Sequence, residues 1–328
     1  MKVLWPHNFN PDVKNAGNFM HLLARGMGKF GVDVRLFYTG SLRSPTGLVR
    51  ARHRIIKMAP EYDLVHAQFG SACSAVTTGV KTKKIVSLRG SDWYRYNTNS
   101  FSGDAHSFLA SSMTRWSLPK YDAVVTMSNR MLREVKARFR NVIVYSIPDP
   151  IDLTKFIPLN RAAARLKLFG KNSNDYWILF ATLSTGNPVK RVSLAQSAVD
   201  IVRQRLGNVE LKVASNIDHN LMPLFVASCD AVLSTSTHEG WPNIIKEALA
   251  CNIPFVATDV SDLREVAGLD PSCRITEPNP EAIATHLCEV LQQRSETLLR
   301  HHVEKMGLEQ TCASLFQVYQ RTLIGDTV

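Results

Sequence analysis

Residues 234–259 read STSTHEGWPNIIKEALACNIPFVATD, and this stretch decides the fold. The run AVLSTS that leads into it and the β-branched run IPFVAT near its end are typical of neighbouring buried parallel strands. Between them the pattern predicts a tight loop that carries Glu239, followed by a helix that opens at Pro242 and carries Glu247. The packing face of that helix is supplied by Ile244, Ile245, Ala248, Leu249 and Cys251. Two carboxylates separated by seven residues therefore stand out from an apolar unit.

This pair of glutamates, inside HEGWPNIIKEALACNIPFVATDV, resembles the signature of the family 4 retaining glycosyltransferases, which have the GT-B fold. The glycine, the proline, the small helix residues and the following strand make the resemblance specific. In that family the first glutamate lies beside the donor hexose and the second binds the ribose of the nucleotide. The resemblance therefore implies these roles for Glu239 and Glu247.

With 328 residues, 45% of them hydrophobic and 20% charged, the chain is long enough for two cores of about 150 residues each. In both halves, β-branched runs alternate with helical patterns, which favours open parallel sheets covered by helices. The proline-rich stretch 147–158, IPDPIDLTKFIP, is the predicted linker.

The predicted fold class is α/β, with two Rossmann-like doubly wound domains facing across a cleft. Residues 1–150 form the acceptor-side domain and residues 151–308 form the nucleotide-sugar domain. The resemblance implies that a C-terminal helix, 309–328, packs back on the first domain.

Residues 25–31 read RGMGKFG and formally match GxGxxG, the dinucleotide-binding fingerprint. That fingerprint needs its glycines after a strand and at the start of a helix, whereas these follow a helical pattern and precede the strand-like VDVRLFY. They are predicted to terminate a helix. The interpretation of the chain as a nicotinamide-dependent dehydrogenase therefore loses its main support.

The six cysteines are scattered without any CxxC motif, which indicates reduced, buried thiols in a cytosolic protein. No apolar run approaches the roughly 18 to 20 residues that span a bilayer, and the first residues lead directly into a strand. We therefore expect a cytoplasmic protein with neither a signal peptide nor a membrane span.

The net charge of +11 is unevenly spread along the chain. Residues 1–150 carry 22 Lys plus Arg against 9 Asp plus Glu, whereas residues 151–328 carry 17 against 19. The first half therefore suits an anionic partner: nucleic acid, an acidic glycan or an anionic membrane face. Nucleic acid ranks last because the first half lacks any zinc-finger spacing or aromatic RNA-binding signature.

Residues 48–59, LVRARHRIIKMA, predict a basic amphipathic helix. Its apolar arc consists of Leu48, Val49, Ala51, Ile55, Ile56, Met58 and Ala59, opposite Arg50, His53, Arg54 and Lys57. Such a helix can lie on anionic lipid, which would place the protein peripherally at the inner face of the membrane. It can equally be an outer helix with its apolar face on the sheet.

The first strand-to-helix loop, PHNFNPDVKNAGNF, is long and carries Gly17 directly before the helix. A glycine there lets backbone amides approach an anion or a sugar at the positive end of a helix, although a plain surface loop has the same composition. The resemblance implies a glycine-containing loop that faces the cleft, which makes Gly17 and Asn18 candidates.

Residues 86–93, VSLRGSDW, are similar to the family's strand followed by His-Gly-Ser-Asp, with Arg89 where histidine usually stands. An arginine cannot shuttle protons as an imidazole does. Arg89 is therefore expected to hold a phosphate or an acidic acceptor, and Asp92 to lie in the same cleft.

The departing diphosphate of a sugar nucleotide needs positive groups around it. The segment TGNPVKRVSLA places Lys190 and Arg191 in a loop before a helix, whose N-terminus adds a partial positive charge. Lys190 matches the family's diphosphate lysine. The arginine that the family places shortly before this lysine is absent, and Arg191 or Arg89 is conjectured to replace it. A Lys-Arg pair at a helix start is otherwise simply solvated.

Glu247 can accept hydrogen bonds from both ribose hydroxyls, and Glu239 would support positive charge at the anomeric carbon. His238 and Trp241 flank Glu239 as walls of the donor or acceptor site. The predicted catalytic residues are Glu239, Lys190 and Arg191. The predicted donor-binding residues are Glu247, Gly240, Trp241, Pro242, Asn243, Ile244, Ser215 and Asn216.

No DxD motif and no paired His or Cys at ligand spacing occurs, so neither a metal nor a cofactor besides the nucleotide-diphosphate sugar donor is expected. The predicted function is a retaining, metal-independent glycosyltransferase that moves a hexose from a nucleotide sugar to a glycan, lipid-linked or small-molecule acceptor. The alternative is a non-catalytic GT-B accessory subunit that binds nucleotide or anionic glycan, which the missing arginine and histidine favour.

Overall fold

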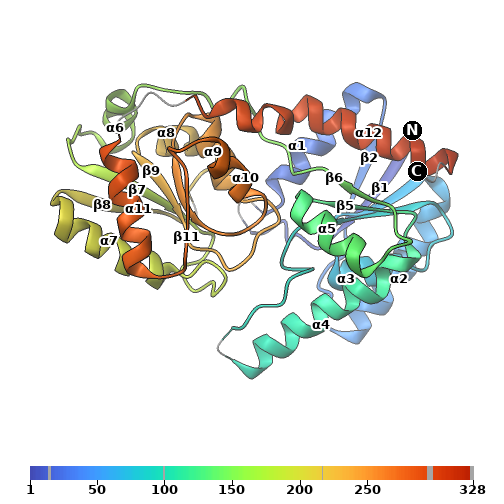
Figure 1. Ribbon diagram of the computed structural model, residues 1–328. Helices are drawn as coiled ribbons and strands as arrows, with labels where there is room; N and C mark the ends of the chain where they lie inside the picture. Colours follow the sequence, from blue (N-terminus) through green and yellow to red (C-terminus); the bar gives the residue numbers. More distant parts are fainter. Residues whose placement is uncertain (14–15, 99, 216, 294–297, 326–328) are drawn as a thin grey trace. The chain divides into compact units, whose positions relative to one another are not determined.

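The computed structural model describes residues 1–13, 16–98, 100–215, 217–293 and 298–325 (Figure 1). By its internal contacts the chain divides into two compact units. Unit 1 comprises Met1–Pro150, Glu239–Trp241 and Leu308–Val328, and unit 2 comprises Ile151–His238 and Pro242–Gly307. Each unit contains one parallel sheet with alternating helices, so the predicted α/β class with two Rossmann-like domains is confirmed.

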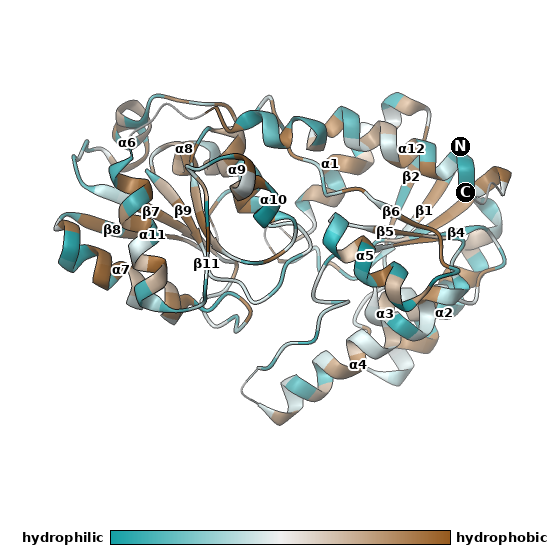
Figure 2. Ribbon diagram, viewed as in Figure 1, coloured by the Kyte–Doolittle hydropathy of each residue, from teal (hydrophilic) through white to brown (hydrophobic). Residues whose placement is uncertain are grey.

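The sheet of unit 1 has six parallel strands, and the strand order reverses direction between β1 and β3. In spatial order they are β2 (Asp33–Tyr38), β1 (Lys2–His7), β3 (Leu64–Ala67), β4 (Lys84–Leu88), β5 (Ala123–Thr126) and β6 (Val144–Ser146). Val3, Val65 and Val124 are wholly buried in the central strands, which explains why short β-branched runs suffice here. Figure 2 shows these strands mainly in the brown of hydrophobic residues.

The helices of unit 1 begin and end where local sequence signals predict. They are α1 (Asn18–Met27), α2 (Pro45–Met58), α3 (Ser71–Thr77), α4 (Phe101–Ser117), α5 (Asn129–Arg138) and α12 (Leu308–Ile324), with 3-10 turns η1 (Gly28–Phe30), η2 (Ala59–Glu61) and η3 (Leu118–Lys120). Ser44, Ser100 and Ser128 cap α2, α4 and α5 by accepting a hydrogen bond from the backbone N–H three residues later. After α1 the chain passes through η1 to Gly31, whose φ of 69° is left-handed, so RGMGKFG terminates a helix as predicted.

Helix α12 packs on α1 and on the sheet of unit 1 through buried side chains. The Tyr319 hydroxyl accepts a hydrogen bond from Trp5 Nε1 at 3.0 Å and lies 2.7 Å from His66 Nδ1. A Cβ atom added at Gly26 of α1 would lie 2.6 Å from Cys312 Sγ of α12, so this close approach requires a glycine. The C-terminal helix is thereby fixed to the first and third strands of the chain.

Helix α2 covers residues 48–58 of the predicted basic amphipathic helix, and its apolar face lies on the sheet. Ala51 and Ile55 are fully buried in a cluster with Leu4 and Val65 of the strands. The interpretation as an outer helix of a doubly wound domain therefore holds for α2. Ala59 is buried as well, whereas Val49 and Ile56 of the same arc are exposed, so only part of the apolar arc contributes to the core.

The sheet of unit 2 has five parallel strands. In spatial order they are β11 (Arg274–Thr276), β10 (Phe255–Thr258), β9 (Ala231–Ser234), β7 (Tyr176–Ala181) and β8 (Val209–Ala214). Its helices are α6 (Arg161–Phe169), α7 (Val192–Leu206), α8 (Met222–Ala227), α9 (Asn243–Ala250), α10 (Leu263–Leu269) and α11 (Pro280–Gln292), with the 3-10 segment η4 (Arg300–Met306). One core cluster joins α7 and α11 to the strands through Ile178, Val199 and Leu287, all wholly buried.

All six cysteines are free thiols and five are buried, in agreement with the sequence. Burial raises the pKa of Cys73 and Cys229 to about 12, so these thiols stay protonated. Within the part of the chain that the structure describes, no helix combines the length and the apolar character that crossing a membrane requires.

Candidate functional site

The carboxyl ends of β7 and β9 lie next to each other in the sheet of unit 2. The chain runs from β7 to β8 on one side and then crosses back to β9 on the other, so the strand order reverses between β7 and β9. In doubly wound sheets, ligands bind outside the carboxyl ends of the strands at such a switch point. Lys190 and Arg191 follow β7 and Glu239 follows β9, so the structure brings their loops to one edge of the sheet.

Hydrogen bonds tie these two loops together. The Thr235 hydroxyl donates to the backbone oxygen of Lys190 at 2.6 Å, and the Thr237 N–H donates to the backbone oxygen of Val189 at 2.9 Å. Lys190 is half-buried, two residues before the start of α7. The loop that carries the predicted diphosphate lysine is therefore held against the loop that leads to Glu239.

Arg191 is the strongest link between the two loops. Its backbone is left-handed, with φ 51° and ψ 53°, which is uncommon for a residue other than glycine. Its Nε donates to the Thr235 carbonyl at 2.5 Å and its Nη2 to the Ser236 carbonyl at 3.1 Å. Burial lowers the pKa of the guanidinium from its ordinary value, but arginine remains charged in proteins. Nη1 has no hydrogen-bond partner among the described residues, so this edge can bind an anion.

Glu247 lies on α9, and its side chain is only 12% exposed. His219 Nε2 lies 3.3 Å from Glu247 Oε1, and Lys155 Nζ lies 3.1 Å from His219 Nδ1. A lysine ammonium only donates, so Nδ1 must accept and the ring proton must be on Nε2. The imidazole therefore donates to Glu247, and Glu247 Oε2 has no protein partner in the described part of the chain.

Sequence reasoning missed His219 and Lys155. His219 follows β8, and Lys155 belongs to the stretch that was assigned to the linker. Phe156 packs edge-on against the His219 ring, with 5.7 Å between ring centroids. No motif in the sequence marks these residues; the only available signal was that the loop after β8 ends at the same edge of the sheet as those after β7 and β9.

The helix that carries Glu247 starts one residue later than predicted. Pro242 is the N-cap with an extended ψ of 116°, and α9 begins at Asn243. Ile244 and Ile245 are buried, whereas Asn243 is exposed at the first turn. The first N–H groups of a helix lack intrahelical acceptors and favour an anion. The predicted use of this backbone for the diphosphate is compatible with the geometry.

Glu239, Gly240 and Trp241 connect β9 to Pro242, and by contacts these three residues group with unit 1. Glu239 is half-buried and Trp241 is 6% exposed. The preceding His238 is buried, and its Nδ1 lies 3.0 Å from the Thr237 hydroxyl. Ser215 directly follows β8 and is half-buried, whereas Asn216 lies outside the described residues.

In unit 1, Gly17 is the N-cap of α1 and has a left-handed backbone, with φ 74°. A Cβ atom added there would lie 3.3 Å from the Phe9 side chain, so space and backbone both favour glycine. Asn18 is the first residue of the helix and is half-buried. The predicted glycine-containing loop thus lies at the carboxyl end of β1, beside the switch point between β1 and β3.

Arg89 follows β4 and is bound on all sides within unit 1. Its Nε donates to the Gln68 carbonyl at 2.8 Å, its Nη2 to Gln68 Oε1 at 2.9 Å, and its Nη1 forms an ion pair with Asp149. Its guanidinium lies over the Phe19 ring, 4.1 Å from the centroid. Because the side chain is only 7% exposed and its charge is already paired, Arg191 is the better candidate to replace the missing family arginine.

Asp92 is fully buried and binds the backbone of its own loop. Its Oδ1 accepts from the N–H groups of Arg89 and Gly90, both at 2.9 Å, and its Oδ2 accepts from Gly70 N at 2.7 Å. Burial raises the pKa of this carboxyl above its ordinary value, against the lowering effect of these bonds. The carboxylate is thus occupied by the protein, which assigns it to the shape of the loop rather than to direct acceptor contact.

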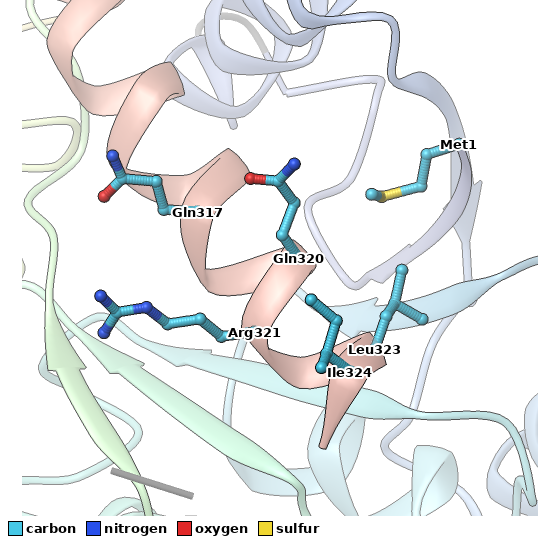
Figure 3. A pocket seen from close by; sticks show the side chains of 6 residues that line it. All are labelled: Met1, Gln317, Gln320, Arg321, Leu323 and Ile324. Carbon is cyan, nitrogen blue, oxygen red and sulfur yellow. The ribbon is translucent and has the colours of Figure 1, made fainter. Parts of the chain in front are cut away.

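Two hollows elsewhere on the units contain none of the predicted site residues. One, of about 420 Å³, lies beside the end of α12 and is lined by Gln317, Gln320 and Arg321 together with Met1 (Figure 3). The other, of about 560 Å³, lies in unit 2 beside Arg165 and Asp230, which form an ion pair at 2.8 Å. Within the described ranges, no three His, Cys, Asp or Glu side chains gather as a metal site would need.

Comparison with known proteins finds a match for the part of the chain that carries the candidate site. Residues 186–293 match the family model of Glycosyl transferases group 1. This region is therefore similar to a glycosyltransferase domain. It contains Lys190, Arg191, Glu239 and Glu247, so the resemblance to GT-B glycosyltransferases read from the Glu239 stretch is confirmed.

Full-length proteins of similar sequence or fold extend the comparison beyond this region. TuaC of Bacillus subtilis, named as a teichuronic acid biosynthesis glycosyltransferase, is 20% identical over 79% of this chain and 66% of its own length. Among solved structures, sucrose-phosphate synthase of Thermosynechococcus elongatus superposes with a TM-score of 0.77 at 14% identity, covering 99% of this chain and all of that one. HepE of Anabaena, solved with UDP and glucose, gives a TM-score of 0.71 at 14% identity, covering 98% and 99%. The fold is that of the GT-B glycosyltransferases.

Proposed function

We propose that this protein transfers a hexose from a nucleotide-diphosphate sugar to a glycan, lipid-linked or small-molecule acceptor, with retention of configuration and without a metal ion. The observation that carries the proposal is the cluster at the carboxyl edge of the unit 2 sheet. There a buried, oriented Glu247 lies on α9, and Lys190 and Arg191 lie on the neighbouring loop.

Glu247 suits a ribose diol. His219 occupies Oε1 and fixes the orientation of the carboxylate, while Oε2 remains available to accept from a hydroxyl. A charge-assisted hydrogen bond of this kind contributes about 1.5–3 kcal/mol. The match of this region to the glycosyltransferase family and the UDP bound to HepE support a nucleotide as the ligand.

The diphosphate is proposed to bind between the Lys190–Arg191 loop and the N-terminus of α9. Arg191 presents Nη1, Lys190 adds a second charge, and the first turns of α7 and α9 add partial positive charge. These groups stabilise negative charge on the departing oxygens, which is the part a divalent ion plays in other transferases. Glu239 is proposed to lie beside the hexose and to support positive charge at the anomeric carbon.

The acceptor is proposed to bind to unit 1, whose excess of Lys and Arg suits an anionic group. Gly17 and Asn18 at the carboxyl end of β1 are the proposed contacts. The name of TuaC refers to teichuronic acid, and a TarM variant of S. aureus, which has a similar fold, was solved with fondaparinux. Both names support a glycan as the acceptor class.

Transfer and donor hydrolysis, measured with a panel of nucleotide sugars, test the proposal. Wild-type protein should turn over at least one donor in the presence of EDTA, the product should keep the anomeric configuration by NMR, and Glu239→Ala should lose turnover. Absence of turnover with every donor, or unchanged turnover in Glu239→Ala, would overturn the catalytic assignment. A wild type that binds nucleotide without turnover would instead be a GT-B accessory subunit, the alternative that the engaged Arg89 at the family's histidine position favours.

A further inference from the structure

Helix α4 has the reverse of the usual polarity of a surface helix. Its buried positions are Ser107, Ser111, Thr114 and Ser117, each at most 1% exposed. Its exposed positions include Phe101 at 92%, Phe108 at 53%, Leu109 at 54% and Trp116 at 57%. A helix on a soluble domain normally turns its apolar stripe to the core and its polar side to water. The aromatic side chains of α4 therefore lie outside the hydrophobic core of unit 1.

The inward hydroxyls explain how the fold tolerates this reversal. Thr114 donates to the Asp92 carbonyl at 2.6 Å, and Ser117 donates to the Ser74 hydroxyl of α3 at 2.8 Å. Ser107 accepts from Tyr96 N at 2.9 Å. Small hydroxyl side chains let α4 approach α3 closely with their polar atoms satisfied. The polar side of α4 thus faces the core of unit 1, and more than half of the surface of each large apolar side chain on its outer side stays exposed.

The exposed apolar side chains form one continuous stripe. At 100° per residue, Phe101, Phe108, Leu109 and Trp116 fall within an arc of about 100°, on the side opposite the buried hydroxyls. Ala105 and Ser112 lie between them on the same arc. In Figure 1, α4 extends beyond the other helices of unit 1 at its N-terminal end. Single exposed apolar residues are ordinary, but an aligned row of them marks an interaction surface.

Cations border this stripe. The Arg95 guanidinium lies 4.3 Å from the Phe108 ring centroid, and Lys120 Nζ lies 3.0 Å from that of Trp116. Arg115, on the same helix, has its pKa lowered by burial and by the nearby charges of Arg138 and Arg95. The surrounding domain contributes 22 Lys plus Arg against 9 Asp plus Glu over residues 1–150. The stripe therefore lies in a positive field.

We propose that the exposed stripe of α4, with Arg95 and Lys120 at its border, docks unit 1 onto the surface of an anionic phospholipid bilayer. Trp and Phe side chains enter the boundary between headgroups and acyl chains, and the cations pair with lipid phosphates. A purely apolar partner would not account for the basic border, and a purely anionic one would not account for Phe101, which is almost fully exposed. The inference does not depend on the proposed transfer reaction.

The fluorescence of Trp116 can report membrane binding. Of its five tryptophans, Trp5, Trp93, Trp177 and Trp241 are at most 6% exposed, so Trp116 alone can change its environment at a membrane. The full chain is sedimented with vesicles of phosphatidylcholine alone and with vesicles of equimolar phosphatidylcholine and phosphatidylglycerol. We expect sedimentation with the anionic vesicles only, a blue shift of tryptophan emission, and loss of that shift in Trp116→Phe.

The decisive variant is Phe101→Ser/Phe108→Ser/Trp116→Ser, which removes exposed side chains and should keep the wild-type circular dichroism. It should no longer sediment with anionic vesicles. The matched control, Leu166→Ser/Leu269→Ser/Leu298→Ser, removes leucines of unit 2 that are 60%, 77% and 79% exposed and should sediment as wild type. A wild type that stays in solution, a triple variant that still sediments, or an unshifted Trp116 spectrum on bound protein would overturn the proposal. So would dimerisation of the wild type, measured by analytical ultracentrifugation, that the same triple variant abolishes, because the stripe would then bind a second copy.

Discussion

Removing the Glu247 carboxylate should weaken nucleotide binding, and the burial of this side chain sets the expected loss of binding free energy. The side chain is 12% exposed, so a hydrogen bond to a ribose hydroxyl there is poorly screened by water. A charge-assisted bond of this kind contributes about 1.5–3 kcal/mol. Glu247→Ala should therefore raise the Kd for the nucleotide by about tenfold to about a hundredfold. Isothermal calorimetry with UDP, the nucleotide of the HepE complex, measures this directly.

His219 should act through Glu247 and contribute less. Its Nε2 to Oε1 distance of 3.3 Å is long for a hydrogen bond, and its ring is 36% exposed. We expect His219→Ala alone to cost about 0.5–1 kcal/mol of binding free energy. In the Glu247→Ala background the same change should cost nothing further, because the group that it orients is gone. A double-mutant cycle isolates this coupling.

A second His-Glu pair in unit 2 provides the control. His286 Nδ1 lies 3.1 Å from Glu289 Oε2 on the surface of α11, outside the edge that carries Glu247. Glu289→Ala and His286→Ala should leave UDP affinity unchanged. Equal UDP affinity of wild type and Glu247→Ala would refute the ribose role, and additive effects of Glu247→Ala and His219→Ala would refute the orienting role of the imidazole.

Three further changes test the chemistry and the fold. Arg191→Lys keeps the charge but loses the planar fork that holds the Thr235 loop, so kcat in the transfer assay should fall about tenfold or more while the overall fold by circular dichroism is unchanged. Tyr319→Phe removes the hydroxyl that contacts Trp5 and His66 and should cost about 1–3 kcal/mol of unfolding free energy in urea; a loss below about 0.5 kcal/mol would contradict the buried network. Burial lowers the pKa of His66 to about 3, so the unfolded chain binds this proton from pH 6.5 downward while the folded one does not. The free energy of unfolding should therefore decrease as the pH is lowered below 6.5, and this residue should account for about 2 kcal/mol of that loss at pH 5. A urea midpoint that does not change between pH 7 and pH 5 would contradict this expectation.

The fold and the elements of unit 2 follow from the sequence because their signals are local. Alternating β-branched and helical runs predict the two parallel sheets, and RGMGKFG predicts the end of a helix by its glycines. Likewise Glu247 can be placed on its helix from the spacing and apolar pattern of residues 234–259 alone. The hydrogen-bond donor to Glu247 cannot be identified in this way, because His219 follows a different strand, β8, and Lys155 lies in the predicted linker. Contacts between loops depend on the order of the strands in the sheet, and the hydrophobic periodicity of the sequence does not determine that order.

The polarity of α4 shows a second limit of pattern analysis. The charge excess of residues 1–150 predicts an anionic partner, and the amphipathic pattern of residues 48–59 suggests where a membrane would bind. The structure places Ala51 and Ile55 of that helix in the core. In α4, by contrast, the buried side consists of hydroxyls and the apolar side faces out, so its periodicity alone would assign the wrong face to the core. Only the position of Asp92 and α3 beside Thr114 and Ser117 reveals which side is inward.

The arginine at the position of the family's histidine can now be given a physical role. Arg89 follows β4 and connects it to the ends of β3, β5 and β6, because its partners Gln68, Met127 and Asp149 follow those three strands. A histidine has too few donors to make these contacts together, since its ring carries at most two N–H groups against the five of a guanidinium. The substitution therefore exchanges a side chain capable of proton transfer for one that fixes the carboxyl edge of the sheet. It follows that any acid-base step in the proposed transfer must come from other groups. Loss of Arg89 should show first in the stability of unit 1, because its buried ion pair with Asp149 and its hydrogen bonds to Gln68 would be lost.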